Sequence, residues 1–306
     1  MKNLRIEALI LSFVLALAHA GQITAAPDLG ESLDYTLRFR GLVTGFVELD
    51  IAKLTLSVAP SLDEISGRTA YNTRLHLTTE PYKKAEMLYP LRLDYRSWLD
   101  QQTLQPLLAA KYLVTDETKR ELFWYDREDE QGYHYQTPKK ADASSGGEPS
   151  AQLLQMAALT EAGWSGLREN KQIALDPADI VDYMGLMYQL RRLPAEPGRR
   201  FDFTVFTGKK LEYYQAQVER DHLLKRGWDR DALLLTLHEY DPKHDELKDE
   251  IKLWLSDDDQ RLLLRFYAES AWGALEGILD TGRPDNGHHD ELPESTRRSL
   301  ETYLDF

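Results

Sequence analysis

Residues 33–40 read LDYTLRFR, and their alternation of apolar and polar side chains predicts a half-buried β-strand. Gly41 and Gly45 bracket the connection to a second alternating stretch, residues 47–51. Further stretches of this kind are 54–58, 71–77, 91–95, 121–125, 132–136, 201–206, 211–218 and 232–237. Many strands at short spacing predict a mainly β fold, either a curved antiparallel sheet or an open β-barrel with one or two covering helices.

Two helices are expected to cover this sheet. The clearer one begins at Asp176, an N-cap residue followed by Pro177 at the first helical position, and ends at Arg192. Its apolar residues predict one buried stripe, made of Ile180, Tyr183, Met184, Met187 and Leu190. A second helix is expected over 151–162, after residues 141–150 (ADASSGGEPS), whose composition is that of a flexible linker.

The first 20 residues have the layout of a secretory signal peptide. A basic start at Lys2 and Arg5 precedes an apolar run, residues 8–18, and Ala18-His19-Ala20 offers small residues where a signal peptidase reads. The run is too short to span a bilayer as a helix, which needs roughly 20 apolar residues. We therefore expect cleavage after Ala20 and a periplasmic product. A retained membrane anchor is the alternative.

Charge and cysteine content narrow the possible partners. The chain has no cysteine, so it can carry neither a lipidated cysteine nor a disulfide. Its net charge is −14, and −15 once Lys2, Arg5 and Glu7 are removed with the leader. Such acidity argues against binding to nucleic acid and to anionic membrane surfaces. We expect no integral membrane segment in the mature form, a single β-rich domain over 21–280 and a polar tail over 281–306.

The common catalytic patterns are missing from the sequence. It has no cysteine nucleophile, no H-E-x-x-H zinc helix, no G-x-S-x-G elbow and no glycine-rich phosphate loop. The run Asp257–Asp259 lacks the spacing of a calcium loop, and His288-His289 would point to opposite sides of an extended tail. We expect no catalytic residues, no metal and no cofactor. A pair of carboxylates acting on a glycosidic bond stays open, because the chain holds 51 Asp and Glu.

Residues 251–266 (IKLWLSDDDQRLLLRF) predict a hairpin that supplies the candidate binding site. A four-residue turn at 257–260 would bring six apolar residues to one face, through the pairs Leu255–Leu262, Leu253–Leu264 and Ile251–Phe266. The opposite face would then carry the candidate binding residues Lys252, Trp254, Arg261 and Arg265. The cations suit a carboxylate or phosphate, and the indole suits the apolar part of an anionic amphiphile. Alternatively, the cations pair with carboxylates and the indole is covered.

Three stretches carry a family resemblance: GESLDY (30–35) with GLVTG (41–45); Asp182, Tyr188, Leu190 and Arg191 with Gly198 and FDF (201–203); and IKLWLSDD (251–258) with Arg261 and Arg265. In this order they resemble domain-of-unknown-function family 3108, whose members are exported bacterial proteins. The resemblance covers most of residues 30–279. It implies an envelope location and a β fold of open-barrel type, and it implies no catalytic residues.

Together these observations predict a non-enzymatic periplasmic or envelope protein. It would bind an apolar or amphiphilic ligand such as a lipid, or an envelope protein, on the concave side of the sheet. One alternative is a structural or assembly factor of the envelope without a small-molecule ligand; another is a carbohydrate-active enzyme. A large inner cavity favours the first reading, and a filled core with an exposed apolar patch favours the second. Two carboxylates about 5–10 Å apart in a cleft favour the third.

The leader gives a direct prediction. We expect the exported protein to begin at Gly21 and to be recovered in the periplasmic fraction without detergent, because a basic, apolar and small-residue pattern directs cleavage. Intact-mass measurement of the purified protein checks this. A mass that includes residues 1–20 would contradict the prediction.

Overall fold

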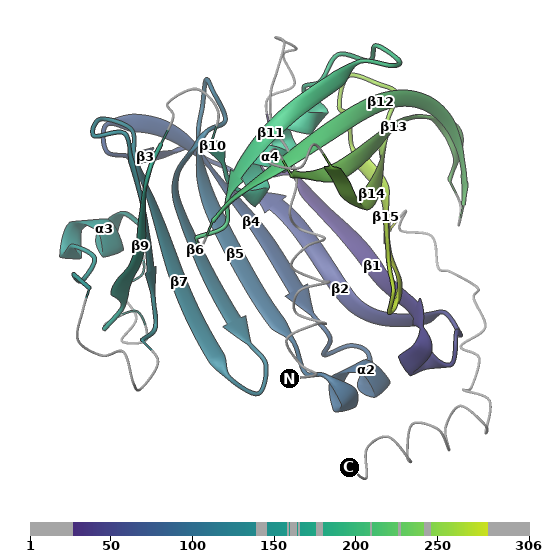
Figure 1. The fold of residues 1–306 in the computed structure, drawn as a ribbon, viewed down its shortest axis with the longest axis horizontal. Coiled ribbons are helices and arrows are strands. Elements are labelled where there is room, and N and C mark those ends of the chain that lie inside the picture. The colour runs from purple at the N-terminus through teal and green to yellow at the C-terminus, as the bar shows by residue number, and fades with distance from the viewer. Residues whose placement is uncertain are drawn as a thin grey trace.

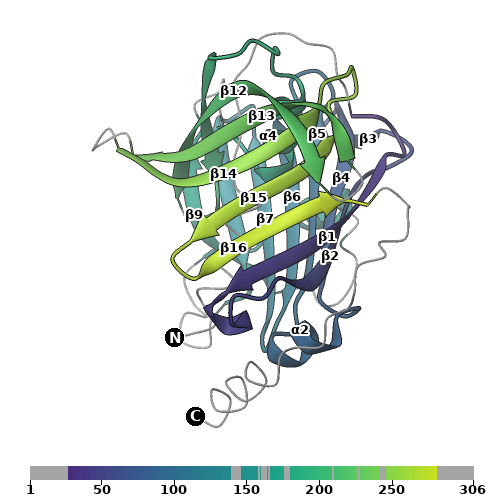
Figure 2. The same cartoon turned by 90° about the vertical axis from the view of Figure 1, so that its right-hand side faces the viewer.

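One strongly curved sheet dominates the computed structural model, which describes residues 27–138, 146–157, 159, 164, 166–175, 180–208, 210–225, 228–241 and 246–280 (Figures 1 and 2). Its strands are β1 (Ser32–Gly41), β2 (Leu49–Val58), β3 (Asp63–Ile65), β4 (Arg68–Thr78), β5 (Arg92–Asp100), β6 (Pro106–Val114), β7 (Thr118–Asp126), β8 (Gln131–Gln136), β9 (Arg168–Ala174), β10 (Ile180–Val181), β11 (Arg200–Phe206), β12 (Leu211–Lys225), β13 (Trp228–Asp241), β14 (Glu246–Ser256), β15 (Leu263–Ser270) and β16 (Gly273–Leu279). The helical elements are η1 (Leu42–Thr44), α2 (Lys83–Leu88), α3 (Ala151–Met156) and α4 (Tyr183–Arg191).

The strand order shows how the two halves of the chain are joined. The 16-stranded sheet runs from β10 through β11 to β16 in chain order, then through β1, β2 and β4 to β9, with β3 paired to β4. The first strand therefore lies beside the last, with Tyr35 opposite Leu279 and Gly41 opposite Gly273. All pairs are antiparallel except β10 with β11, and β9 and β10 end the sheet without pairing to each other. The predicted mainly β, open-barrel fold is confirmed.

The concave side of the sheet is packed by both halves of the chain. Phe123 of β7 meets Phe206 of β11 edge to face, with ring centroids 6.3 Å apart. A Cβ atom on Gly208 would lie 2.5 Å from the Phe123 ring, so the β11–β12 turn sits directly on β7. Leu54, Met184 and Phe266 are among the residues around a remaining apolar space of about 30 Å³. A space of this size is far smaller than a typical ligand pocket.

Helix α4 fills the concave side, and its start differs from the expected one. Asp182 is the N-cap: its Oδ1 accepts a hydrogen bond from the Gly185 N–H at 2.8 Å, and its Oδ2 accepts one from the Tyr95 hydroxyl at 3.0 Å. The predicted start at Asp176 is therefore wrong, because residues 180–181 form β10 beside β11 before the helix begins. Asp176 itself lies outside the described residues. The predicted stripe is confirmed at Met184 and Leu190, which are buried.

The second predicted helix covers the convex side. α3 begins after Ser150, whose Oγ accepts a hydrogen bond from the Leu153 N–H at 3.1 Å. It ends at Met156, earlier than the expected 162, although residues 160–162 lie outside the described part of the chain. A second apolar cluster forms where this region packs on the sheet; its buried members include Trp98, Leu108, Leu122, Leu153, Ala157, Leu159, Trp164 and Leu167. Both faces of β5–β7 are thus covered.

The concave side of β6–β8 also holds charged and polar groups that the sequence analysis did not single out. Lys111 Nζ lies 3.1 Å from Glu121 Oε2, and His134 Nε2 lies 3.8 Å from the same oxygen. Asn170 Nδ2 lies 3.1 Å from His134 Nδ1, which makes Nδ1 the acceptor and directs the Nε2 proton toward Glu121. Burial would raise the pKa of the Glu121 carboxyl, but Lys111 and His134 outweigh burial and lower that pKa from 4.5 to about 2.

This carboxylate predicts a dependence of stability on acid. A folded-state pKa of about 2 means that Glu121 stabilises the fold fully above pH 4.5, and that the contribution is lost as the pH falls toward 2. We expect Glu121→Gln to lower the free energy of unfolding at pH 7 on the order of 3 kcal/mol. The gap between variant and wild type should narrow from pH 4.5 to 2, as measured by urea unfolding.

Glu86 on α2 is the control, because hydrogen bonds from Arg92 and Thr79 also lower its pKa to about 2. Its carboxylate lies nearer to solvent, where water and salt screen the pair. Glu86→Gln should therefore remove a smaller part of the acid dependence of wild type than Glu121→Gln does. Equal effects of the two substitutions would show that the Glu121 cluster has no special role.

Candidate functional site

The predicted closing hairpin, β14–β15, forms with a different register. Trp254 pairs with Arg265, and Leu253 pairs with Phe266 instead of Leu264. The register shifts between Trp254 and Leu255, so the pairing that the apolar pattern predicted is wrong. Trp254 and Arg265 still share the face opposite to Leu253 and Phe266, as expected.

The turn of this hairpin explains the shift. Asp258 Oδ1 accepts hydrogen bonds from Ser256 Oγ at 2.6 Å, the Gln260 N–H at 3.1 Å and the Arg261 N–H at 3.2 Å. Arg261 adopts a left-handed backbone, with φ of 50°. This carboxylate-centred turn is wider than the four-residue turn that the sequence predicted, and Leu262 is consequently only partly buried.

Trp254 and Arg265 are engaged within the protein. The Arg265 guanidinium carbon lies 4.1 Å from the Trp254 ring centroid, and its Nε donates to Glu276 Oε1 at 2.6 Å. Trp254 is 6% exposed and donates from Nε1 to Asp221 Oδ2 at 2.7 Å. Lys225 Nζ reaches Glu276 Oε1 at 2.7 Å, so the end of the β12–β13 hairpin folds back onto β16.

The other two predicted binding residues are also paired. Arg261 Nη1 lies 2.8 Å from Asp257 Oδ1, and Lys252 Nζ lies 3.0 Å from Glu250 Oε1. This arrangement favours the alternative in which the cations pair with carboxylates and the indole is covered. Ligand binding by these four residues stays a prediction. Each of the four side chains already has a partner within the protein.

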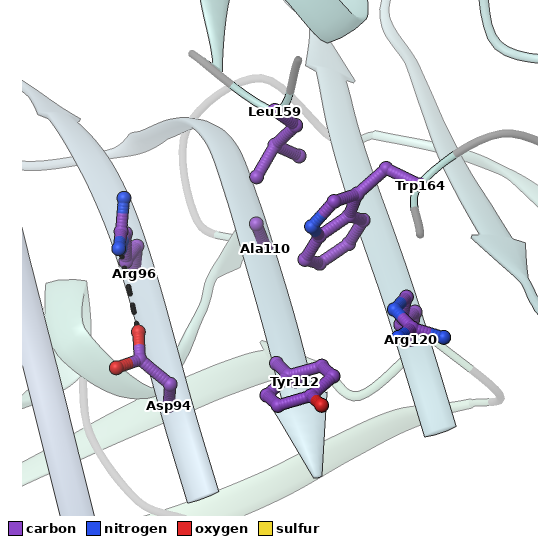
Figure 3. A pocket seen from close by; sticks show the side chains of 7 residues that line it. All are labelled: Asp94, Arg96, Ala110, Tyr112, Arg120, Leu159 and Trp164. Carbon is purple, nitrogen blue, oxygen red and sulfur yellow. Dashed lines mark hydrogen bonds and ion pairs between the residues drawn. The ribbon is translucent and has the colours of Figure 1, made fainter. Parts of the chain in front are cut away.

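A pocket of about 260 Å³ lies on the opposite half of the sheet, on the convex face of β5–β7 (Figure 3). Its lining residues are Asp94, Arg96, Ala110, Tyr112, Arg120, Leu159 and Trp164. Side chains alternate between the two faces of a strand, and Leu93, Tyr95 and Phe123 point into the concave core. The strand residues between them therefore point outward and line the pocket. This pocket was not predicted from the sequence. Its local indication is the polar face of the predicted strand 91–95, which carries Asp94.

Cross-strand pairing places the pocket floor. Asp94 lies opposite Tyr112, and Tyr112 lies opposite Arg120, so three side chains form one row across β5, β6 and β7. Arg96 lies opposite Ala110 in the neighbouring row. Figure 3 shows Arg96 and Asp94 on one side and Arg120 on the other, with Ala110 and Tyr112 between them. The small Ala110 side chain leaves room that Leu159 and Trp164 border from above.

The charge of the pocket is opposite to that of the chain. Among the described lining residues Asp94 is the single carboxylate, and it pairs with Arg96 Nε at 3.3 Å and with Arg74 Nε of β4 at 2.7 Å. The Arg120 guanidinium carbon lies 5.0 Å from the Tyr112 ring centroid, a cation–π contact. Two lining guanidinium groups therefore face one carboxylate that a third guanidinium already neutralises, which leaves the site cationic.

Chemically, this pocket is amphipathic. Leu159 and Trp164 offer an apolar wall, and Arg96 and Arg120 offer donors that match carboxylate or phosphate oxygens. Among the described lining residues one carboxylate is present, whereas glycosidic cleavage uses a pair. Within the described residues, no group of three or more His, Asp or Glu side chains is placed to hold a metal ion. No helix of the described part is long and apolar enough to cross a membrane.

Comparison with known proteins bears on the C-terminal half of the sheet. Residues 161–280 match the model of a family described as "Protein of unknown function (DUF3108)". The expected resemblance is thereby confirmed over that range. The matched range includes α4, the closing hairpin and Trp164, whereas the pocket floor on β5–β7 lies outside it.

No curated protein matches the chain. A solved structure, the β-barrel-like protein of domain of unknown function DUF1849 from Brucella abortus, is similar with a TM-score of 0.47 and 9% sequence identity. The match covers 84% of this chain and 98% of that one.

The Trp254 cluster predicts a structural role for Arg265. We expect Arg265→Ala to lower the free energy of unfolding by about 2–3 kcal/mol, because it removes a charge-assisted hydrogen bond and a cation–π contact. Lys252→Ala is the control, since exposed pairs contribute only about 0–1 kcal/mol. Denaturant unfolding measures both. If Arg265→Ala were as stable as Lys252→Ala, the arginine would be available for another role.

Proposed function

We propose that this protein is an exported, non-enzymatic binding protein of the cell envelope, whose ligand is an anionic amphiphile. In this proposal the convex pocket on β5–β7 holds the anionic end. The observation that carries it is the juxtaposition of Arg96 and Arg120 with the apolar wall of Leu159 and Trp164 around about 260 Å³. The leader pattern of residues 1–20 supports export.

The pocket chemistry suits such a ligand for three reasons. A carboxylate or phosphate between the two arginines would accept charge-assisted hydrogen bonds from both sides of the pocket. The indole of Trp164 and the side chain of Leu159 would pack against an apolar chain or ring next to the anion. The volume is slightly below that of a drug-sized pocket, roughly 300–1,000 Å³, so it suits one end of a ligand whose remainder lies outside.

The concave side was the expected ligand site. Because that side is closely packed, we place the proposed ligand site on the convex face. Among the described residues, the space between α4 and the strands around Leu54 and Phe266 is about 30 Å³. That packing also favours the alternative, a structural or assembly factor without a small-molecule ligand. The two proposals differ in one respect that can be measured, which is saturable binding of an amphiphilic anion.

Decanoate is a suitable probe, measured by isothermal titration calorimetry against decanol as the uncharged analogue. We expect saturable decanoate binding that weakens with salt, because exposed charge pairs are screened. The double substitution of Arg96→Gln and Arg120→Gln should weaken it at least tenfold, which corresponds to about 1.4 kcal/mol. Asp94 keeps its pair with Arg74 in this variant, so stability should change little.

Arg200→Gln is the matched control, because Arg200 is exposed on β11, away from the pocket. It should bind decanoate as wild type does. Equal binding of decanol and decanoate, or unchanged binding by the double variant, would contradict the pocket assignment. Mass spectrometry of lipid extracts from natively purified protein should identify a bound acidic amphiphile. The absence of both a bound amphiphile and decanoate binding would leave the assembly factor as the supported function.

A further inference from the structure

Two loops meet at one end of the β1–β16 seam. Gly41, the last residue of β1, lies opposite Gly273, the first of β16, and the Leu42 N–H donates to the Trp272 carbonyl at 3.4 Å. A Cβ atom on Gly41 would lie 2.3 Å from that carbonyl oxygen, and one on Gly273 would lie 2.5 Å from the Arg40 carbonyl oxygen. The two glycines therefore allow an approach of the loops that no other residue permits.

Three large apolar side chains project from these loops. Leu42 is 61% exposed, Phe46 is 67% exposed and Trp272 is 50% exposed. We call these three residues the apolar tip. The stretches GLVTGFV (41–47) and SAWGAL (270–275) contain no charged residue, although charged residues make up 29% of the chain. Glu48, which ends the first loop, lies 3.6 Å from Arg38 Nη1. The tip is thus uncharged and apolar at the same time. Figures 1 and 2 both place α2, whose Met87 is also exposed, near η1 at this end.

The backbone holds Phe46 in an unfavourable conformation. Its φ is 64°, directly after Gly45 at 60°, and its N–H donates to the Gly41 carbonyl at 2.8 Å. A left-handed conformation is common for glycine and rare for a bulky residue. Strain of this kind concentrates at functional sites, and here it presents a ring to solvent instead of burying it. The turn therefore holds the exposed ring in a defined position.

Trp272 is also held in a defined turn. Ser270 Oγ accepts a hydrogen bond from the Trp272 N–H at 3.2 Å and donates one to the Gly273 carbonyl at 3.2 Å. Both loops are therefore organised before any partner arrives, which lowers the entropy that binding would cost.

We propose that the apolar tip inserts into the headgroup region of a neutral, zwitterionic lipid bilayer. Trp, Phe and Leu are the residues that partition into the membrane interface, with Trp at the headgroup level. The absence of charge in stretches 41–47 and 270–275 favours neutral lipid over an anionic surface, which the acidic chain would repel. The three side chains expose on the order of 350 Å². A stable protein interface buries about 800 Å² per partner, so the tip is too small for one.

Vesicle flotation tests this with the chain of residues 21–306 and phosphatidylcholine vesicles. Wild type should float with the vesicles. The double variant of Phe46→Gly and Trp272→Ser should bind at least tenfold more weakly, and its thermal unfolding should show that it is folded. Phe46→Gly alone suits the left-handed backbone and should also weaken binding, so it keeps the test valid if the double variant does not fold.

Two controls separate the tip from other surfaces. Leu224 is 74% exposed at the end of β12, and Leu224→Ser should float as wild type does. The pocket variant of Arg96→Gln and Arg120→Gln should also float, so that failure of this proposal and failure of the pocket proposal are distinguishable. As a second readout, wild-type tryptophan emission should shift to the blue with vesicles, and Trp272→Phe should abolish most of the shift.

Several outcomes would overturn the proposal. One is a wild-type protein that does not float, or that floats only with anionic vesicles. Another is a Leu224→Ser variant that loses binding as strongly as the tip variant. A third is a wild-type dimer in solution that the tip variant lacks, which would assign the tip to protein association.

Discussion

The curved sheet depends on one constraint, which is that its concave side must be filled from within. Helix α4 meets this requirement, and a fully buried carboxylate fixes where the helix begins. Asp182 caps the helix through the Gly185 N–H and is held by the Tyr95 hydroxyl of β5. At the other end, Arg191 forms a two-pronged ion pair with Glu31, with both nitrogen–oxygen distances 2.7 Å. Arg191 Nη2 also donates to the Gln260 carbonyl of the β14–β15 turn at 3.0 Å, so the helix is fastened to both halves of the sheet. Within the described residues, the packed interior directs recognition toward the outer surfaces.

The strands and their inward faces could be predicted from the sequence because alternation is a local property. Residues 33–40 show this, since Tyr35 and Leu37 are buried in the core as their period predicts. Features that depend on a distant partner were not predictable. The helix start required knowledge that β11 would pair with residues 180–181, and the hairpin register required the Asp258 carboxylate to organise its turn. The convex pocket draws on three strands and on Trp164, which no local pattern connects.

The acidic chain divides its outer surface into regions of different chemistry. The cations of the closing hairpin are engaged in internal pairs, as Arg265 is with Glu276 of β16, and Lys225 of β12 joins the same carboxylate. The convex pocket keeps an excess of guanidinium groups, and the apolar tip beside Gly41 and Gly273 presents uncharged side chains. An overall charge of −14 therefore says little about any single surface, and function has to be argued region by region.

The pairing of β1 with β16 has a consequence for how the chain is made. A ribosome synthesises β1 well before β16, and the two strands are brought together across more than 200 residues, as the Tyr35–Leu263 hydrogen bond also requires. Until β16 emerges, one edge of β1 has no strand to bond with and can pair with other chains. Contacts so distant in sequence also slow folding. The nascent protein therefore passes through a long period in which a chaperone that covers β1 would protect it from aggregation.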